Sequence, residues 1–147
     1  MTNAVAVVLP LEPGSARRAR EQLEPFRKSL EEMSFLDLRL LVSELVVEAL
    51  NTESEAQGAR IELWAELRED RVHVEVAEGG AAFRLPSRRP EPGEAGWGLH
   101  LVRRLSSRWG IRREPERASV WLEMPLAGER FGRRAPVQPS LPERRRL

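Results

Sequence analysis

The sequence predicts an α/β (α+β) fold: a two-layer sandwich in which three helices cover one face of a mixed, mostly antiparallel sheet of about five strands. Two patterns lead to this fold class. Apolar residues recur every three or four positions from Ser34 to Ala49, which is the period of a helix with one buried face. From Arg60 to Val76 apolar and charged residues alternate, which is the period of strands with one covered and one wet face. A chain of 147 residues is long enough to bury one core between these layers.

The first elements are a strand and a helix. Residues 4–9 are rich in valine and end at Pro10, which predicts a short strand, because proline cannot continue a hydrogen-bonded ladder. Ser15 is expected to cap a helix. The apolar stripe of that helix comprises Ala16, Ala19, Leu23, Phe26 and Leu30. Pro25 interrupts the stripe and is predicted to kink or split the helix.

The second helix is the best candidate for the centre of the core. Ser34, with Asp37 three residues later, is typical of a helix start. The apolar face comprises Leu38, Leu41, Val42, Leu45, Val46 and Ala49. The alternating segments that follow are joined by Arg68-Glu69-Asp70 and predict a hairpin. His73 and Trp64 fall on its polar face, where we expect both side chains to be exposed.

The second half of the chain predicts a loop, a helix and a last hairpin. Residues 84–95 are rich in Pro, Arg and Glu, which is typical of a mobile loop. A third helix is expected from Leu99 to about Ser106, and the final hairpin pairs residues 109–113 with 118–124. We therefore expect one domain over residues 1–126, with a loop or lid at 84–95, and a basic, disordered tail over residues 127–147.

Composition excludes several classes of function. The 24 basic and 23 acidic side chains nearly cancel, so no overall field attracts nucleic acid or a membrane. The chain has no cysteine, which excludes disulfides and cysteine nucleophiles, and its two histidines are too few for a histidine metal site. No apolar run approaches the length of a membrane span, so a soluble cytoplasmic protein is expected.

Three segments stand out together, in an order and spacing that resemble the N, G1 and G2 boxes of the GHKL ATPase superfamily. They are Ser43-Glu44-Leu45-Val46-Val47-Glu48, Val76-Ala77-Glu78-Gly79-Gly80-Ala81-Ala82-Phe83 and Gly96-Trp97-Gly98-Leu99. Within that superfamily the chain resembles the anti-sigma-factor serine/threonine kinases of bacteria. The resemblance implies a Bergerat fold, ATP and Mg²⁺ as cofactors, a sigma factor or antagonist domain as protein partner, and pairing as a homodimer.

The N box keeps one of the two polar residues of the family. There a glutamate positions or deprotonates the attacking group, and an asparagine one turn later holds Mg²⁺. The resemblance implies the role of catalytic base for Glu44, whereas Glu48 stands at the asparagine position. Glu48 is therefore the candidate Mg²⁺ ligand, because a cation would relieve the repulsion between two carboxylates one turn apart. A solvated helix face is an equally weighted alternative for this pair.

The G1 box departs from the family at two positions. The family has an aspartate that reads the adenine amino group, and Glu78 stands there with a side chain longer by one methylene. A later glycine of the family is Ala82 here, while Gly80 remains where the backbone passes close to the base. The resemblance implies adenine contacts for Glu78 and Gly80.

The G2 box keeps its glycines. Gly96, Gly98 and Leu99 are expected to bind the phosphates, because free backbone N–H groups at a helix start attract anions. Trp97 stands where the family often has arginine, which removes a phosphate contact. Three arginines of the preceding loop are candidates to replace it, although surface arginines are usually solvated: Arg84, Arg88 and Arg89.

Three functions follow from these observations. The favoured hypothesis is a regulatory, anti-sigma-factor-like protein of a partner-switching circuit, with an eroded ATP site and weak or no kinase activity. It is favoured because Glu48, Glu78 and Ala82 change three different contacts of the nucleotide. An active Mg-ATP-dependent anti-sigma serine/threonine kinase is the first alternative. A basic-tailed nucleic-acid-binding protein is the second, and the balanced charge argues against it.

Overall fold

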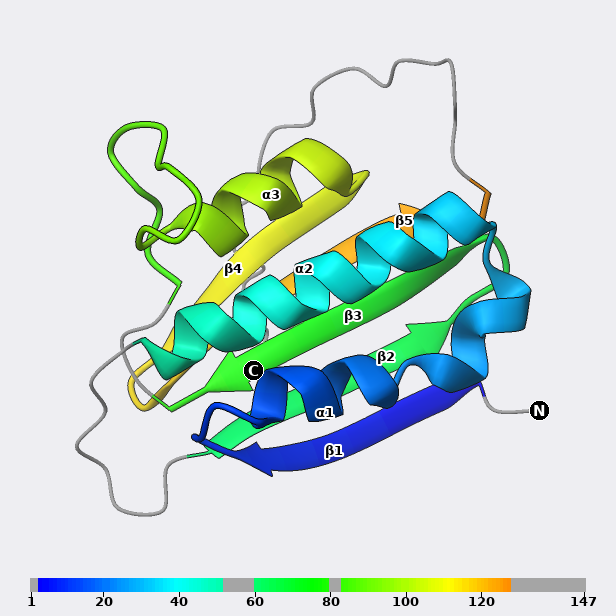
Figure 1. Cartoon of the computed structure of the whole chain (residues 1–147), viewed down its shortest axis with the longest axis horizontal. Helices are drawn as coiled ribbons and strands as arrows, with labels where there is room; N and C mark the ends of the chain where they lie inside the picture. The colour runs from blue at the N-terminus through cyan, green and yellow to red at the C-terminus, as the bar shows by residue number, and fades with distance from the viewer. Residues whose placement is uncertain (1–2, 52–59, 80–82, 128–147) are drawn as a thin grey trace.

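The computed structural model describes residues 3–51, 60–79 and 83–127 (Figure 1). Its strands are β1 (Ala4–Pro10), β2 (Arg60–Leu67), β3 (Arg71–Glu78), β4 (Arg108–Glu114) and β5 (Arg117–Pro125). Its helices are α1 (Ser15–Glu21), the 3₁₀ helix η1 (Glu24–Ser29), α2 (Glu32–Leu50) and α3 (Trp97–Leu105). The predicted tail from Gly128 onward, Gly80 and Ala82 lie outside the described residues.

The strands form one sheet in the order β1-β2-β3-β5-β4. All four pairings are antiparallel, so the prediction of a mixed sheet was wrong in this respect. The reason is topological: β4 runs parallel to β3, but β5 lies between them, and no two neighbours run in the same direction. Both predicted hairpins are confirmed, with Leu67 opposite Val72 in one and Glu114 opposite Arg117 in the other.

The helices lie on one face of the sheet, which confirms the two-layer sandwich (Figure 1). The predicted split of the first helix is confirmed: α1 ends at Glu21, and Pro25 lies in the first turn of η1, where its missing N–H cannot continue an α-helical ladder. The two predicted caps were wrong. Ser15 is the first helical residue and its hydroxyl donates to the carbonyl of Pro10 at 2.6 Å, while α2 begins two residues before Ser34.

The core fills the space between the helices and the sheet. The predicted apolar stripe of α2 is fully buried, and its members pack with inward-facing residues of every strand. The largest of the fully buried side chains are Trp109, Phe26, Phe35, Phe83 and Leu9. Among the described residues, no helix is both long and apolar enough to cross a bilayer.

The face of the sheet away from the helices is only partly wet. Trp64 is 41% exposed, as predicted for the polar face of β2. His73, predicted to be exposed, is 8% exposed, and this expectation was wrong. Its ring stacks on Trp121 with centroids 5.8 Å apart, and its Nδ1 lies 2.9 Å from a carboxylate oxygen of Glu123, so cross-strand neighbours cover it.

Candidate functional site

Helix α2 presents two carboxylates to the start of α3. The buried stripe of α2 includes Leu41, Leu45 and Val46, which fixes the rotation of the helix on the sheet. Glu44 and Glu48 are one turn apart and therefore share a helix face. Both side chains are partly buried, and both belong to residues that approach Gly98.

The carboxylate of Glu48 binds two backbone N–H groups of the Gly96-Trp97-Gly98 segment. The N–H of Gly96 donates to Oε2 at 2.5 Å, and the N–H of Gly98 donates to Oε1 at 3.1 Å. We call this pair of hydrogen bonds the Glu48 bridge. The intervening N–H of Trp97 donates to the carbonyl oxygen of Glu94 at 3.0 Å. A negative side chain from another helix thus satisfies the amides at the α3 N-terminus, where the helix dipole also favours negative charge.

Both glycines are needed for this geometry. Gly96 has φ +92°, a left-handed conformation that residues with a side chain rarely adopt, and it packs against Pro86. Gly98 lies so close to α2 that a Cβ atom there would be 2.9 Å from the carbonyl oxygen of Glu44. The absence of side chains therefore allows α3 to begin directly against α2 and within reach of Glu48.

Glu44 makes no hydrogen bond to the α3 segment in the described contacts. Burial raises the pKa of its carboxyl group, and the nearby charge of Glu48 raises it further. A carboxylate with a raised pKa is a stronger base, which is the direction that the predicted role of Glu44 requires. Its predicted catalytic role remains a prediction.

The structure brings together four of the predicted site residues: Glu44, Glu48, Gly96 and Gly98. Glu78 is 2% exposed at the end of β3, in the sheet rather than between the helices. Leu99 is 1% exposed and packs into the core through its side chain. Gly80 lies outside the described residues, so its predicted contact with adenine stays a prediction.

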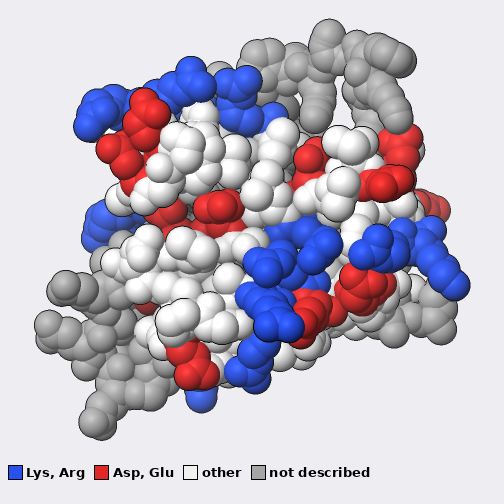
Figure 2. All heavy atoms as spheres, in the orientation of Figure 1, with Lys and Arg blue, Asp and Glu red and all other residues white. Residues whose placement is uncertain are grey.

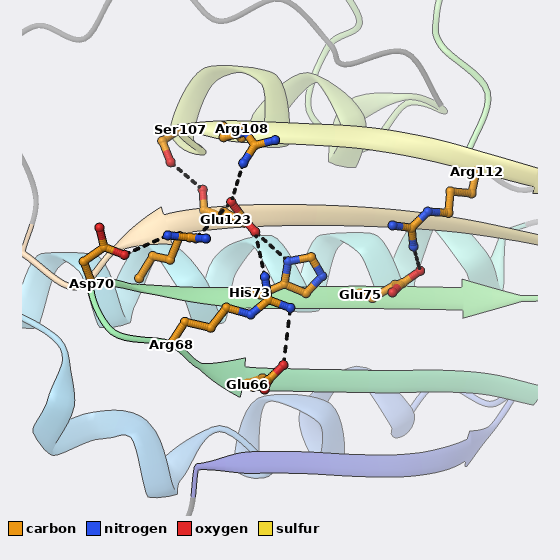
Figure 3. A network of polar contacts seen from close by, with 10 residues as sticks. Glu66, Arg68, Asp70, His73, Glu75, Ser107, Arg108, Arg112 and Glu123 are labelled. Carbon is orange, nitrogen blue, oxygen red and sulfur yellow. Dashed lines mark hydrogen bonds and ion pairs between the residues drawn. The ribbon is translucent and has the colours of Figure 1, made fainter. Parts of the chain in front are cut away.

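A polar cluster that sequence reasoning missed lies on the other face of the sheet (Figure 3). It centres on Glu123, whose side chain is 4% exposed and accepts contacts from His73, Arg68, Arg71 and Arg108. Burial alone would raise the pKa of Glu123, but the hydrogen bond with His73 and the charges of Arg71 and Arg108 outweigh it and lower the pKa. The alternation of β5 shows only that Glu123 points away from the core. Its partners come from two other strands and a turn.

A comparison with known families matches residues 9–124 to the histidine kinase-like ATPase domain. The match runs from the end of β1 to the end of β5, and it covers the N-box helix, the G2 glycines and the sheet between them. The chain belongs to this family. A search of curated proteins found no match to the chain. The resemblance to the GHKL superfamily is thus confirmed for nearly all of the described fold.

Histidine kinase-like ATPase domains typically bind ATP and Mg²⁺. In this chain, the N–H groups of Gly96 and Gly98, which we expect to meet the phosphates, already donate to Glu48. Glu48 also stands at the position from which we expect the metal to be held. Within the described ranges, no three His, Cys, Asp or Glu side chains gather closely enough to hold a metal ion. In this arrangement the residues do not fit a metal-bound triphosphate at the G2 segment.

Proposed function

We propose that the chain is a regulatory, anti-sigma-factor-like protein that binds a protein partner and has weak or no kinase activity. The partner is a sigma factor or an antagonist domain of a partner-switching circuit. The family includes anti-sigma-factor kinases, which supports this class of partner. The protein keeps the fold of those kinases and uses it for binding rather than for phosphoryl transfer.

The observation that carries the proposal is the Glu48 bridge. A phosphate group and the Glu48 carboxylate require the same N–H donors, so one excludes the other. A nucleotide would have to displace the Glu48 carboxylate, which is covalently part of the chain, from these N–H groups. It would also bring its own negative charges next to Glu48 and Glu44. Like charges at close range in a partly buried site oppose that exchange.

Calorimetric titration of the whole chain with Mg-ATP tests the proposal. We expect no binding in the micromolar range, and no transfer of phosphate to serine-containing antagonist domains in a radiometric assay. The double variant Glu48→Asn, Glu78→Asp restores the family residues at two contacts and is expected to gain affinity for Mg-ATP. Micromolar binding by the unchanged chain would overturn the proposal.

The partner is tested separately. Size-exclusion chromatography of the chain mixed with purified sigma factors and antagonist domains of the same organism should yield a complex in the absence of nucleotide. A complex that forms only when Mg-ATP is added would contradict a role that is independent of the nucleotide.

A further inference from the structure

A pocket with basic walls lies between the loop before α3 and the outer face of α3. Its volume is about 320 Å³. Arg88 and Arg89 line it from the loop, and His100, Arg103 and Arg104 line it from the helix. We call it the arginine pocket. Figure 2 shows basic side chains along the edge of the molecule that this loop and α3 form.

The four arginines differ from most other arginines of the described chain. Many of the other described arginines have an acidic partner, as in the pairs Arg17 with Glu21, Arg27 with Glu24, Arg112 with Glu75 and Arg117 with Glu62. Within the described residues, the side chains of Arg88, Arg89, Arg103 and Arg104 form no ion pair or hydrogen bond. The two acidic residues of the same loop, Glu91 and Glu94, do not line the pocket. The carboxylate of Glu94 instead accepts a hydrogen bond from the backbone N–H of Glu91.

The gathered positive charge affects the one other titratable group of the pocket. Burial lowers the pKa of His100, and the charges of Arg89, Arg104 and Arg103 lower it further. Charges of one sign around a concave surface concentrate the electrostatic field and attract anions. An anion that neutralised the arginines would remove this unfavourable concentration of charge.

The pocket also has an apolar floor and a fixed position. Leu99 and Pro90 are buried beneath it, and Pro86 packs against Gly96 at the start of α3. The Glu48 bridge holds the same segment to α2. At the rim, Leu85 is 52% exposed, which is high for a large apolar side chain. A ligand would therefore meet cations, an apolar floor and one apolar rim residue.

We propose that the arginine pocket binds an acidic segment of the protein partner, with carboxylates between the arginines and an apolar side chain against Leu85. Arginine forks match carboxylates in bidentate geometry, and the volume suits a few side chains rather than a nucleic-acid duplex. The net charge of +1 also gives the whole chain no general attraction for nucleic acid. This inference rests on the proposed function, because it names the chemistry of the partner.

Fluorescence anisotropy with a labelled peptide of six glutamates and one leucine tests the pocket in the full chain. The variant Arg103→Glu, Arg104→Glu is expected to weaken binding by about tenfold or more, because favourable charge pairs become repulsive. Arg88→Gln, Arg89→Gln changes only the loop and should also weaken binding. The matched control is Arg17→Glu, Arg18→Glu on α1, which changes the net charge equally and should alter affinity less than about twofold.

Histidine NMR gives a second readout. The chain has two histidines, so the ring signals of His100 and His73 are easily separated. Bound peptide should raise the pKa of His100 by neutralising its arginine neighbours, while His73 on the other face of the sheet should not respond. A response of both rings, or of neither while the peptide binds, would place the peptide elsewhere and overturn the inference.

The remaining outcomes separate the two proposals. No peptide binding, or equal weakening by the α1 control, overturns the arginine pocket and leaves the lack of Mg-ATP binding intact. Peptide binding through these arginines in a chain that also binds Mg-ATP with micromolar affinity overturns the proposed function alone. A DNA oligonucleotide that binds more tightly than the peptide, with the same dependence on Arg103 and Arg104, would replace the acidic peptide as ligand class.

Discussion

At residue 48, a single side chain decides what the N–H groups of Gly96 and Gly98 bind in this structure. An asparagine there would be shorter by one methylene and would offer a single neutral acceptor, whereas Glu48 offers two charged oxygens to two N–H groups. Sequence reasoning weighed a metal ligand against a solvated helix face for the pair Glu44 and Glu48. The observed partner is the backbone of a segment 48 to 50 residues away. No local pattern could indicate it.

Glu48→Ala is expected to lower the free energy of unfolding by about 2 kcal/mol, because two part-buried N–H groups lose a charged acceptor. The same change should create an anion site at Gly96 and Gly98. In urea titrations, millimolar pyrophosphate should therefore stabilise Glu48→Ala and leave the unchanged chain unaffected.

The control is Glu44→Ala, which removes an equal charge one turn earlier and leaves the Glu48 bridge in place. It should give no response to pyrophosphate. It should cost little stability, because it removes a carboxyl group whose pKa is raised by burial and by the charge of Glu48. An equal pyrophosphate response in both variants would assign the effect to net charge rather than to the bridge.

At the scale of elements, α3 depends on its contact with α2. It has nine residues, which is short for an independently stable helix, and its N-terminus lies against the carbonyl oxygen of Glu44. The sequence predicted this helix and the position of both glycines at its N-terminus. It did not predict that Gly98 serves the packing of two helices, because the contact joins elements separated by the β2-β3 hairpin.

Gly98→Ala should cost about 2 kcal/mol or more of the free energy of unfolding, because the added Cβ would lie 2.9 Å from backbone that cannot easily move. Gly14→Ala is the matched control. Its Cβ would meet nothing within 4 Å, and its φ of −70° suits alanine, so a change within about 0.5 kcal/mol is expected. Chemical denaturation of both variants measures the difference, and equal stabilities would refute close packing of α3 on α2.

Over the whole molecule, the sheet has two differently built faces. One face packs against the helices through apolar side chains. The other face carries the polar cluster around Glu123 (Figure 3). The exposed side chain of Trp64 lies on that second face as well. Trp121 can lie flat across β4 because its neighbour is Gly110, where a Cβ would be 2.6 Å from the indole nitrogen. The position of Trp121 helps to bury His73 and Glu123 on a face that the alternation of charged residues predicts to be exposed to solvent.

The polar cluster should make stability depend on pH. Because the pKa of Glu123 is lowered in the folded state, the unfolded state binds the proton more readily. The contribution is complete above the unfolded pKa of about 4.3 and is lost as the pH falls through the folded value. Glu123→Gln should lower the free energy of unfolding by about 2 kcal/mol at pH 7 and by clearly less at pH 3.

Urea titrations from pH 3 to pH 7 measure this dependence. Glu62→Gln is the control, since Glu62 pairs with Arg117 at a site where both side chains are 45% exposed, and such pairs contribute little. If Glu123→Gln and Glu62→Gln shift the stability curve equally, the cluster does not act as a buried ion network.

The sequence by itself determined the elements, the buried face of α2, both hairpins and the glycines of the G2 segment. These features follow from the spacing of apolar residues and from backbone freedom, which act over a few residues along the chain. Only the tertiary structure decided the all-antiparallel order of the sheet, the Glu48 bridge, the burial of His73 and the gathering of the arginine pocket. Each of these features joins residues from separate elements, so its energy depends on how those elements pack. The spacing of apolar residues along the chain does not specify that packing.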